Sequence, residues 1–167
     1  MKKRLLIGVI MTECQINFQL DILKGIISQG FKTNSDIVIL APLHNFYVVN
    51  PHKQAEKEIF KLISSQSFDG FLYDRNTIYD EDIKLMTDNL LLASGKPVML
   101  LDSQEHKVFE STAIDDCTAF EQITDHLIDV HGYKKIYCLT GPKKFFVSEE
   151  RMRGFLISMK KHKLSTG

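Results

Sequence analysis

The sequence predicts an α/β fold, a doubly wound parallel β-sheet that carries helices on both faces. Two observations favour this class. Short apolar runs rich in β-branched residues alternate along the chain with segments whose apolar residues recur at helical spacing. The runs are continuous, whereas a strand with one face in water alternates apolar and polar residues. Both faces of the sheet are therefore expected to be covered by helices.

The apolar runs predict six strands, of which the fifth is the weakest. They are residues 5–11, 37–40, 70–73, 97–101, 111–114 and 136–139. Five stripes at helical spacing lie between or after these runs and begin at Phe18, Ala55, Ile83, Phe120 and Met152. We expect Gly132 to end the fourth helix, and Ser148 to cap the fifth, with two glutamates in its first turn.

Polar residues follow most of the predicted strands. In sheets of this class, ligands bind outside the carboxyl ends of the strands, so these segments are the expected site. They are residues 12–15, 41–44, 74–76, 102–104, 115–116 and 141–143. Asp115 and Asp116 are also expected to form a turn and N-cap pair at the start of the fourth helix.

Composition narrows the function further. The 167 residues include 21 Lys and Arg and 21 Asp and Glu, so the formal net charge is zero. A chain without excess positive charge lacks the general attraction to nucleic acid, and a self-contained DNA-binding domain is not expected. The three widely spaced cysteines are typical of a reducing compartment. The apolar run that follows the basic N-terminus is too short for a signal peptide or a membrane span. We therefore expect a cytoplasmic protein without membrane contact.

The motifs of several enzyme classes are missing from the sequence. It contains no G-x-G-x-x-G, no P-loop, no G-x-S-x-G and no H-E-x-x-H. We expect neither a cofactor nor a metal site, and the six histidines are interpreted as surface or boundary residues. A receiver domain is disfavoured, because only Glu13 follows the first strand. One enzymatic alternative stays open, a doubly wound enzyme that uses Asp102, Asp115 and Cys14.

Short motifs in a fixed order resemble the ligand-sensing domain of LacI/GalR-type transcriptional regulators. These regulators are cytoplasmic relatives of the periplasmic sugar-binding proteins. The earlier motifs are Ile7–Ile10 with Phe18, then Phe68–Leu72, then Gly95–Asp102. The most specific motifs are Ile114–Asp116, Asp125–Ile128, His131–Ile136, Leu139–Pro142 and Glu150–Phe155.

The resemblance implies a periplasmic-binding-protein type I-like fold. Residues 1–114 would form the N-terminal lobe, and residues 115–167 the beginning of a C-terminal lobe that is incomplete. The family's helix-turn-helix is expected to be absent from the N-terminal end, so any DNA contact is assigned to an output domain outside this chain. Relatives pair through first-lobe faces, and a homodimer is expected.

The resemblance also implies ligand-binding residues. Phe18, Asp102 and Arg151 match positions of the family's pocket, although Ile16 and Asn17 depart from the pocket-loop motif before Phe18. The guanidinium of Arg151 suits hydroxyl pairs or a carboxylate. The candidate set is completed by four residues placed at strand ends or at the start of the fifth helix, namely Cys14, Asp74, Asp115 and Ser148.

The function implied is effector sensing without catalysis. A small polar metabolite such as a sugar would bind in the interlobe cleft, and an attached output domain would respond by regulating transcription. One alternative is the sensor of a diguanylate cyclase with the same fold. Another is an interaction domain whose pocket has degenerated, which the altered loop before Phe18 favours.

Overall fold

The structure is a computed structural model that describes residues 4–42, 55–103, 108–141 and 145–165. The chain divides into two compact units, Met1–Ala113 and Ile114–Gly167. No helix in these described ranges is both long and apolar enough to cross a lipid bilayer.

The first unit is built on a parallel five-stranded sheet in the order β2-β1-β3-β4-β5. The strands are β1 (Leu5–Ile10), β2 (Ser35–Leu40), β3 (Gly70–Tyr73), β4 (Val98–Leu101) and β5 (Glu110–Thr112). The first five predicted strands are therefore confirmed, with boundaries that differ by one to two residues. Ile10 aligns with Leu40 on one side and with Tyr73 on the other, so three strands end level with one another.

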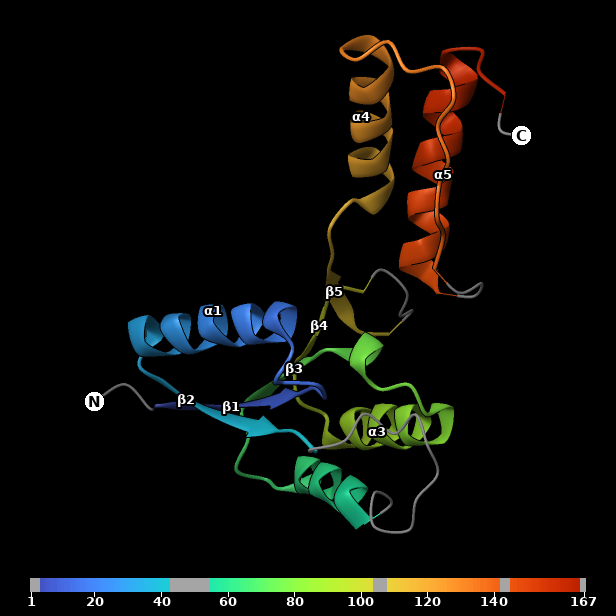
Figure 1. Ribbon diagram of the computed structural model, residues 1–167. Helices are drawn as coiled ribbons and strands as arrows, with labels where there is room; N and C mark the ends of the chain where they lie inside the picture. The colour runs from blue at the N-terminus through green and yellow to red at the C-terminus, as the bar shows by residue number, and fades with distance from the viewer. Residues whose placement is uncertain (1–3, 43–54, 104–107, 142–144, 166–167) are drawn as a thin grey trace. The chain divides into compact units, whose positions relative to one another are not determined.

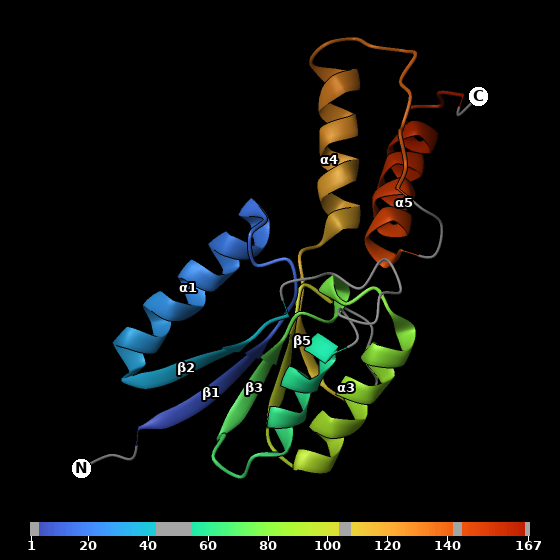
Figure 2. The same cartoon turned by 60° about the horizontal axis from the view of Figure 1, so that its bottom comes forward.

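Helices cover both faces of this sheet, which confirms the doubly wound prediction. Helix α1 (Asn17–Thr33) lies on one face. The 3₁₀ helix η1 (Lys57–Ser64) and helix α3 (Glu81–Ser94) lie on the other, as both views show (Figures 1 and 2). The short 3₁₀ turn η2 (Arg75–Thr77) connects β3 to the segment before α3.

The core of the first unit is uneven between the two faces. The larger cluster packs the sheet against η1 and α3, and its largest fully buried side chains include Phe60, Tyr73 and Ile78. The smaller cluster, under α1, has Val9, Met11 and Leu23 as its buried members. Neighbouring strand residues such as Val9 and Ile10 enter opposite clusters, because successive side chains of a strand point to opposite faces.

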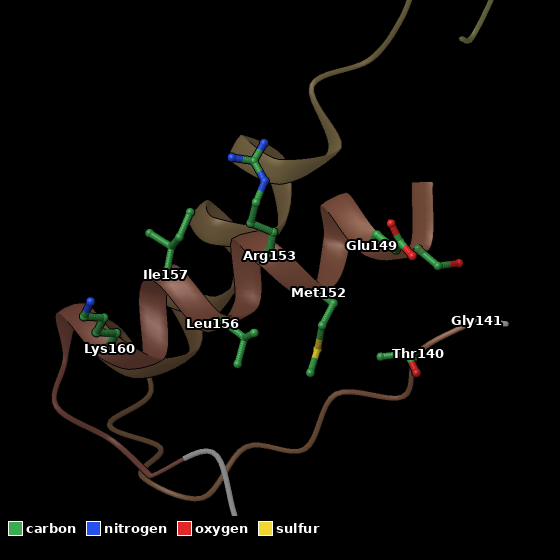
Figure 3. A pocket seen from close by; sticks show the side chains of 9 residues that line it. Thr140, Gly141, Glu149, Met152, Arg153, Leu156, Ile157 and Lys160 are labelled. Atoms are coloured by element: carbon green, nitrogen blue, oxygen red, sulfur yellow. The ribbon is translucent and has the colours of Figure 1, made fainter. Parts of the chain in front are cut away.

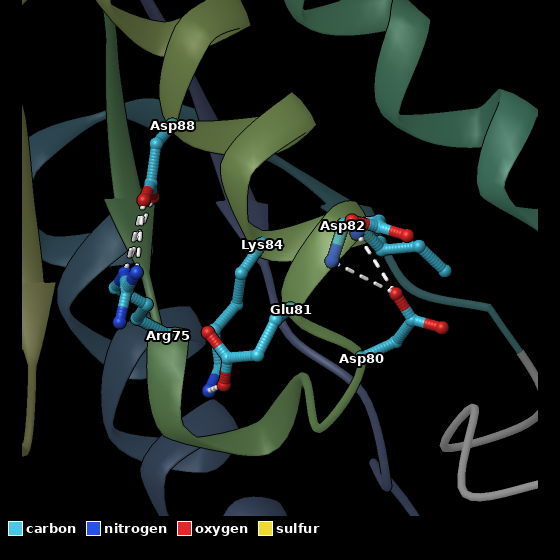
Figure 4. A network of polar contacts seen from close by, with 7 residues as sticks. Arg75, Asp80, Glu81, Asp82, Lys84 and Asp88 are labelled. Carbon is cyan, nitrogen blue, oxygen red and sulfur yellow. Dashed lines mark hydrogen bonds and ion pairs between the residues drawn. The ribbon is translucent and has the colours of Figure 1, made fainter.

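Helix α3 has a defined start and end. The Asp80 carboxylate accepts hydrogen bonds at 3.0 Å from the backbone N–H groups of Asp82 and Ile83, which caps the helix (Figure 4). Gly95 ends it with φ +63°, a conformation that a side chain would strain.

The second unit contains two packed helices, α4 (Asp116–Asp129) and α5 (Phe146–Lys161). The sixth predicted strand, 136–139, is wrong, because residues 132–141 have no regular structure. Tyr137 is 90% exposed and Leu139 fully exposed. A strand forms only where another strand accepts its backbone hydrogen bonds, and the described part of this unit offers none.

Two predicted helix boundaries in this unit have different outcomes. Gly132 has φ +69°, and its N–H donates to the Ile128 carbonyl at 3.0 Å, as expected of a glycine at the end of a helix. Ser148 does not cap α5, which corrects the prediction. The capping residue is Phe145, whose carbonyl accepts the Glu149 N–H at 3.1 Å, and Ser148 lies inside the first turn.

Helices α4 and α5 approach closely at Gly154. A β-carbon built on this glycine would stand 2.1 Å from the Cys117 carbonyl oxygen of α4, so only glycine fits. Farther along, the Asp125 carboxylate accepts hydrogen bonds from Ser158 Oγ and Lys161 Nζ, each at 2.6 Å, and lies 2.9 Å from His162 Nε2. Hydrogen bonds from Lys161, Ser158 and His162 lower the pKa of Asp125 to about 2.

Substitution Gly154→Ala should separate the two helices. The added methyl group meets backbone atoms that cannot move aside, and overpacking of this kind costs about 1–3 kcal/mol. Amide hydrogen exchange in α4 and α5 should become faster. Gly25→Ala is the matched control, because its β-carbon in α1 meets nothing within 4 Å and alanine favours a helix. Equal effects of the two substitutions would contradict this account.

Substitution Asp125→Asn should weaken the packing of α4 on α5 in a pH-dependent way. The pKa of Asp125 falls from 3.8 to about 2, so its contribution to stability is complete above pH about 4 and is lost as pH falls toward about 2. Urea unfolding should therefore show a gap between wild type and variant near neutral pH that closes in acid. Asp129→Asn, at a mostly exposed side chain one turn along α4, should leave a much smaller gap. A gap that persists in acid would contradict the assignment.

Candidate functional site

Two threonines join the carboxyl ends of β1 and β3. The Thr12 N–H donates to Thr77 Oγ1 at 2.9 Å, and the Thr12 hydroxyl donates to the Thr77 carbonyl. The Thr77 hydroxyl donates in turn to the Asp74 carbonyl at 2.8 Å. Both threonines are buried, so these hydrogen bonds are shielded from water and hold the two strand ends in one arrangement.

Three acidic residues follow the neighbouring strands β1, β3 and β4 at this joined edge. They are Glu13, Asp74 and Asp102, and we name them the acidic triad. Glu13 and Asp74 are buried, at 8% and 2% exposure, while Asp102 is partly exposed. Neighbouring polar groups orient them. The Tyr79 hydroxyl donates to Glu13 Oε2 at 3.2 Å, and Asn76 Nδ2 donates to the Asp102 carbonyl.

The acidic triad changes the protonation of its central member. Burial, together with the negative charges of Asp102 and Glu13, raises the pKa of Asp74 to about 7, although hydrogen bonds from backbone N–H groups act to lower it. Near neutral pH, Asp74 is therefore divided between its carboxylate and carboxylic acid forms. The carboxylate accepts hydrogen bonds from hydroxyl groups, and the acid also donates one.

Two members of the acidic triad have an unusual backbone conformation, with positive φ angles. Glu13 has φ +57° and Asp102 has φ +48°, in the left-handed region that residues with side chains rarely adopt. Such a conformation costs about 1–2 kcal/mol, and strained positions cluster at ligand sites. Asp102 directly follows β4, and Glu13 lies shortly after β1, so both strained residues lie at the carboxyl edge of the sheet. This supports the carboxyl edge as the candidate site.

The residue after Asp74 turns away from the acidic triad. Arg75 points to α3, where its Nε and Nη2 donate to the Asp88 carboxylate at 3.0–3.3 Å (Figure 4). This two-pronged pair holds the η2 turn against α3, and the turn carries Asn76 and Thr77. Asp88 therefore positions the polar turn beside Asp74 without belonging to the triad.

Cys14 and Phe18 lie beside this edge with different properties. Burial is the main cause that raises the pKa of the Cys14 thiol, and the Asp74 charge adds to it. A raised pKa disfavours the thiolate, so Cys14 is poorly suited to act as a nucleophile. Phe18 lies in the first turn of α1 and is 48% exposed, so its ring is open to contact.

The predicted site residues of the second unit form a separate group. Asp115 caps α4, because its carboxylate accepts from the Thr118 N–H at 2.9 Å and from the Thr118 hydroxyl at 2.8 Å. This confirms the predicted N-cap role, and these bonds lower the pKa of Asp115. Asp115 belongs to the second unit, whereas Cys14 belongs to the first.

Arg151 is held by α4. Its Nε donates to Asp116 Oδ1 at 2.7 Å, and its guanidinium carbon lies 5.6 Å from the centre of the Phe120 ring. The side chain remains about half exposed. With Ser148 and Thr140 it lines a pocket of about 150 Å³, so the structure brings Arg151 and Ser148 together.

A larger groove of about 470 Å³ runs along α5. Met152 and Leu156 point toward the segment that carries Thr140 (Figure 3). Apolar atoms make up most of the surface of this groove, whereas a site for a polar metabolite needs converging polar groups.

Sequence reasoning found part of the first unit's site. It selected Cys14, Asp74 and Asp102, which the structure places at one edge of the sheet. It passed over Thr77 and Tyr79, which lie beyond the three residues examined after the third strand. His44 and Gln104, from the predicted strand-end segments, lie outside the described residues.

The first unit is a doubly wound α/β domain with polar residues at the carboxyl ends of its strands. A family model described as periplasmic binding proteins and sugar binding domain of LacI family matches residues 4–165. The chain therefore belongs to this family. No curated protein sequence matches it significantly.

Solved structures resemble the chain at low sequence identity. A putative ribose operon repressor from Burkholderia thailandensis has a TM-score of 0.77 at 16% identity, over 99% of this chain and 59% of that one. CcpA of Lactococcus lactis gives 0.72 at 22%, over 99% and 56%. CcpA from Weissella paramesenteroides, with bound sucrose, gives 0.71 at 18%, over 96% and 55%. The chain spans little more than half of each.

The Asp74 carboxyl should titrate near neutral pH. Because its pKa is raised from 3.8 to about 7, ionisation costs stability, and the free energy of unfolding should fall as pH rises from about 4 to about 7. Carbon-13 NMR of the carboxyl group measures the midpoint directly. Asp102→Asn should lower the midpoint by removing a negative charge, while Asp21→Asn, an exposed residue of α1, should not. A wild-type midpoint near 4 would disprove the assignment.

Proposed function

We propose that this chain is the effector-sensing part of a LacI-family transcriptional regulator, and that it binds a small neutral metabolite rich in hydroxyl groups without altering it. The acidic triad is the observation that carries this proposal. Its members follow three neighbouring parallel strands, the charges of Glu13 and Asp102 act on Asp74, and ligands of such sheets bind at the carboxyl ends of the strands. Family membership supports the same function.

The charge of the triad selects among metabolites. Carboxylates accept hydrogen bonds from hydroxyl groups, and a protonated Asp74 can donate one to a ring or carbonyl oxygen. A phosphorylated or carboxylated ligand would meet two or three like charges at a partly buried site and would be repelled. Neutral sugars and nucleosides are therefore favoured over their phosphate esters. Phe18, half exposed at the start of α1, is suited to pack on the apolar face of such a ligand.

The wider role follows from the family. The chain has no net charge, so we assign DNA contact to another domain of the whole protein and expect a cytoplasmic homodimer. The lac repressor, a relative by fold, has been solved as a dimer bound to operator and an anti-inducer. The relatives named are transcription regulators, so the diguanylate cyclase alternative receives no support from them. No sequence motif of catalysis favours turnover of the ligand.

Calorimetry with a panel of neutral sugars and nucleosides, each paired with its phosphate ester, tests the proposal. At least one neutral compound should bind, and its phosphate ester should bind at least about tenfold more weakly. Asp102→Asn should weaken binding of the neutral compound by a similar factor. It should also reduce the ratio between the affinity for the neutral compound and the affinity for its phosphate ester. Asp21→Asn, on the exposed side of α1, is the control.

Two results would contradict the proposal. Preferential binding of the phosphate esters would show that the acidic triad does not face the ligand. Chemical conversion of the bound compound, followed by chromatography over hours, would show that the chain is an enzyme.

A further inference from the structure

Two histidine side chains of the second unit, His126 and His131, contact each other edge-on at the end of α4. The Nε2 atoms of His126 and His131 lie 3.2 Å apart, and the ring planes meet at 78°. Both side chains are hydrogen-bonded to one another at an exposed position. One ring therefore donates its Nε2 proton to the lone pair of the other, and both Nε2 atoms already converge on one point.

The distance between the two nitrogens matches the geometry of a metal ion. Zinc binds imidazole nitrogen at about 2.05 Å, and two such ligands of a tetrahedral ion stand about 3.3 Å apart. The two nitrogens are thus already separated by about the distance that a bound ion requires. The ring that carries the Nε2 proton has only to shift that proton to Nδ1, and the neutral tautomer then presents its lone pair to the metal.

The surroundings of the pair favour a cation. His126 lies in the last turn of α4, where the carbonyl groups of the helix give a negative end. His131 stacks on Tyr133 with ring centres 5.6 Å apart and planes 17° from parallel. This stacking fixes the His131 ring, so less side-chain freedom is lost on binding. In the described ranges no three metal-ligating side chains gather, so water would fill the other positions.

We propose that His126 and His131 form a binding site for a borderline-soft divalent metal ion of the zinc, nickel or copper class. The two imidazole nitrogens select this class over magnesium and calcium, which require oxygen ligands. The site is independent of the acidic triad, which belongs to the first unit. It is also distant from the pocket at Arg151, because Asp116, which holds Arg151, begins α4 and the histidines lie near its end.

Titration of the whole chain, free of any histidine tag, with zinc chloride tests this site. Calorimetry should detect one zinc ion per chain, and the ring signals of His126 and His131 should shift together in NMR spectra. His126→Gln and His131→Gln should each weaken binding at least about tenfold, because each removes one of the two protein ligands. Magnesium should not compete at equal concentration.

His162→Gln is the control. Its Nε2 lies 2.9 Å from a carboxylate oxygen of Asp125 instead of from a second histidine, so the variant tests whether any histidine of this unit would serve. Thermal melts of all variants without metal report whether each one folds. Unchanged zinc affinity in His126→Gln and His131→Gln, or a loss only in His162→Gln, would overturn the proposal. These outcomes are separate from the sugar titrations, whose test variants, Asp102→Asn and Asp21→Asn, lie in the first unit.

Discussion

Thr12 and Thr77 are 65 residues apart in the chain, yet their hydrogen bonds hold the carboxyl ends of β1 and β3 together. The parallel register makes this possible, since Ile10 aligns with Tyr73. Every polar contact of the first unit's site depends on this arrangement. Asp74 is buried because the joined strand ends leave it little access to water, and its charge interacts with Glu13 for the same reason.

An ion pair also supports the candidate site. Arg75 and Asp88 connect the η2 turn to α3, and α3 rests on the larger apolar cluster. The turn that carries Thr77 is therefore held by two sets of interactions. One is the hydrogen bonding with Thr12 after β1, and the other is the ion pair with α3. Rigid placement of this kind lowers the entropy that a ligand must overcome when it binds.

The sequence predicted elements well where local pattern decides the structure. The run 70–73 is a strand because its residues are apolar without interruption, and such a run suits the middle of a covered sheet. The run 136–139 is also apolar without interruption, yet it is not a strand, because pairing depends on a partner that no local pattern reveals. Likewise, Asp74 and Asp102 were found from their position after strands, while Thr77 was missed because it reaches Thr12 only through the tertiary fold.

The positive φ angles at Glu13 and Asp102 have a consequence for how this protein could change. Glycine or asparagine adopts that backbone conformation more easily than a longer side chain, so replacement at either position would relieve strain and make the folded state more robust. A laboratory selection for heat resistance would thus favour substitutions at the two positions whose acidic oxygens the proposed binding site uses. A substitution that stabilises the fold at either position would therefore remove an acidic group of the proposed binding site, so stability and the proposed recognition place opposite demands on these two residues.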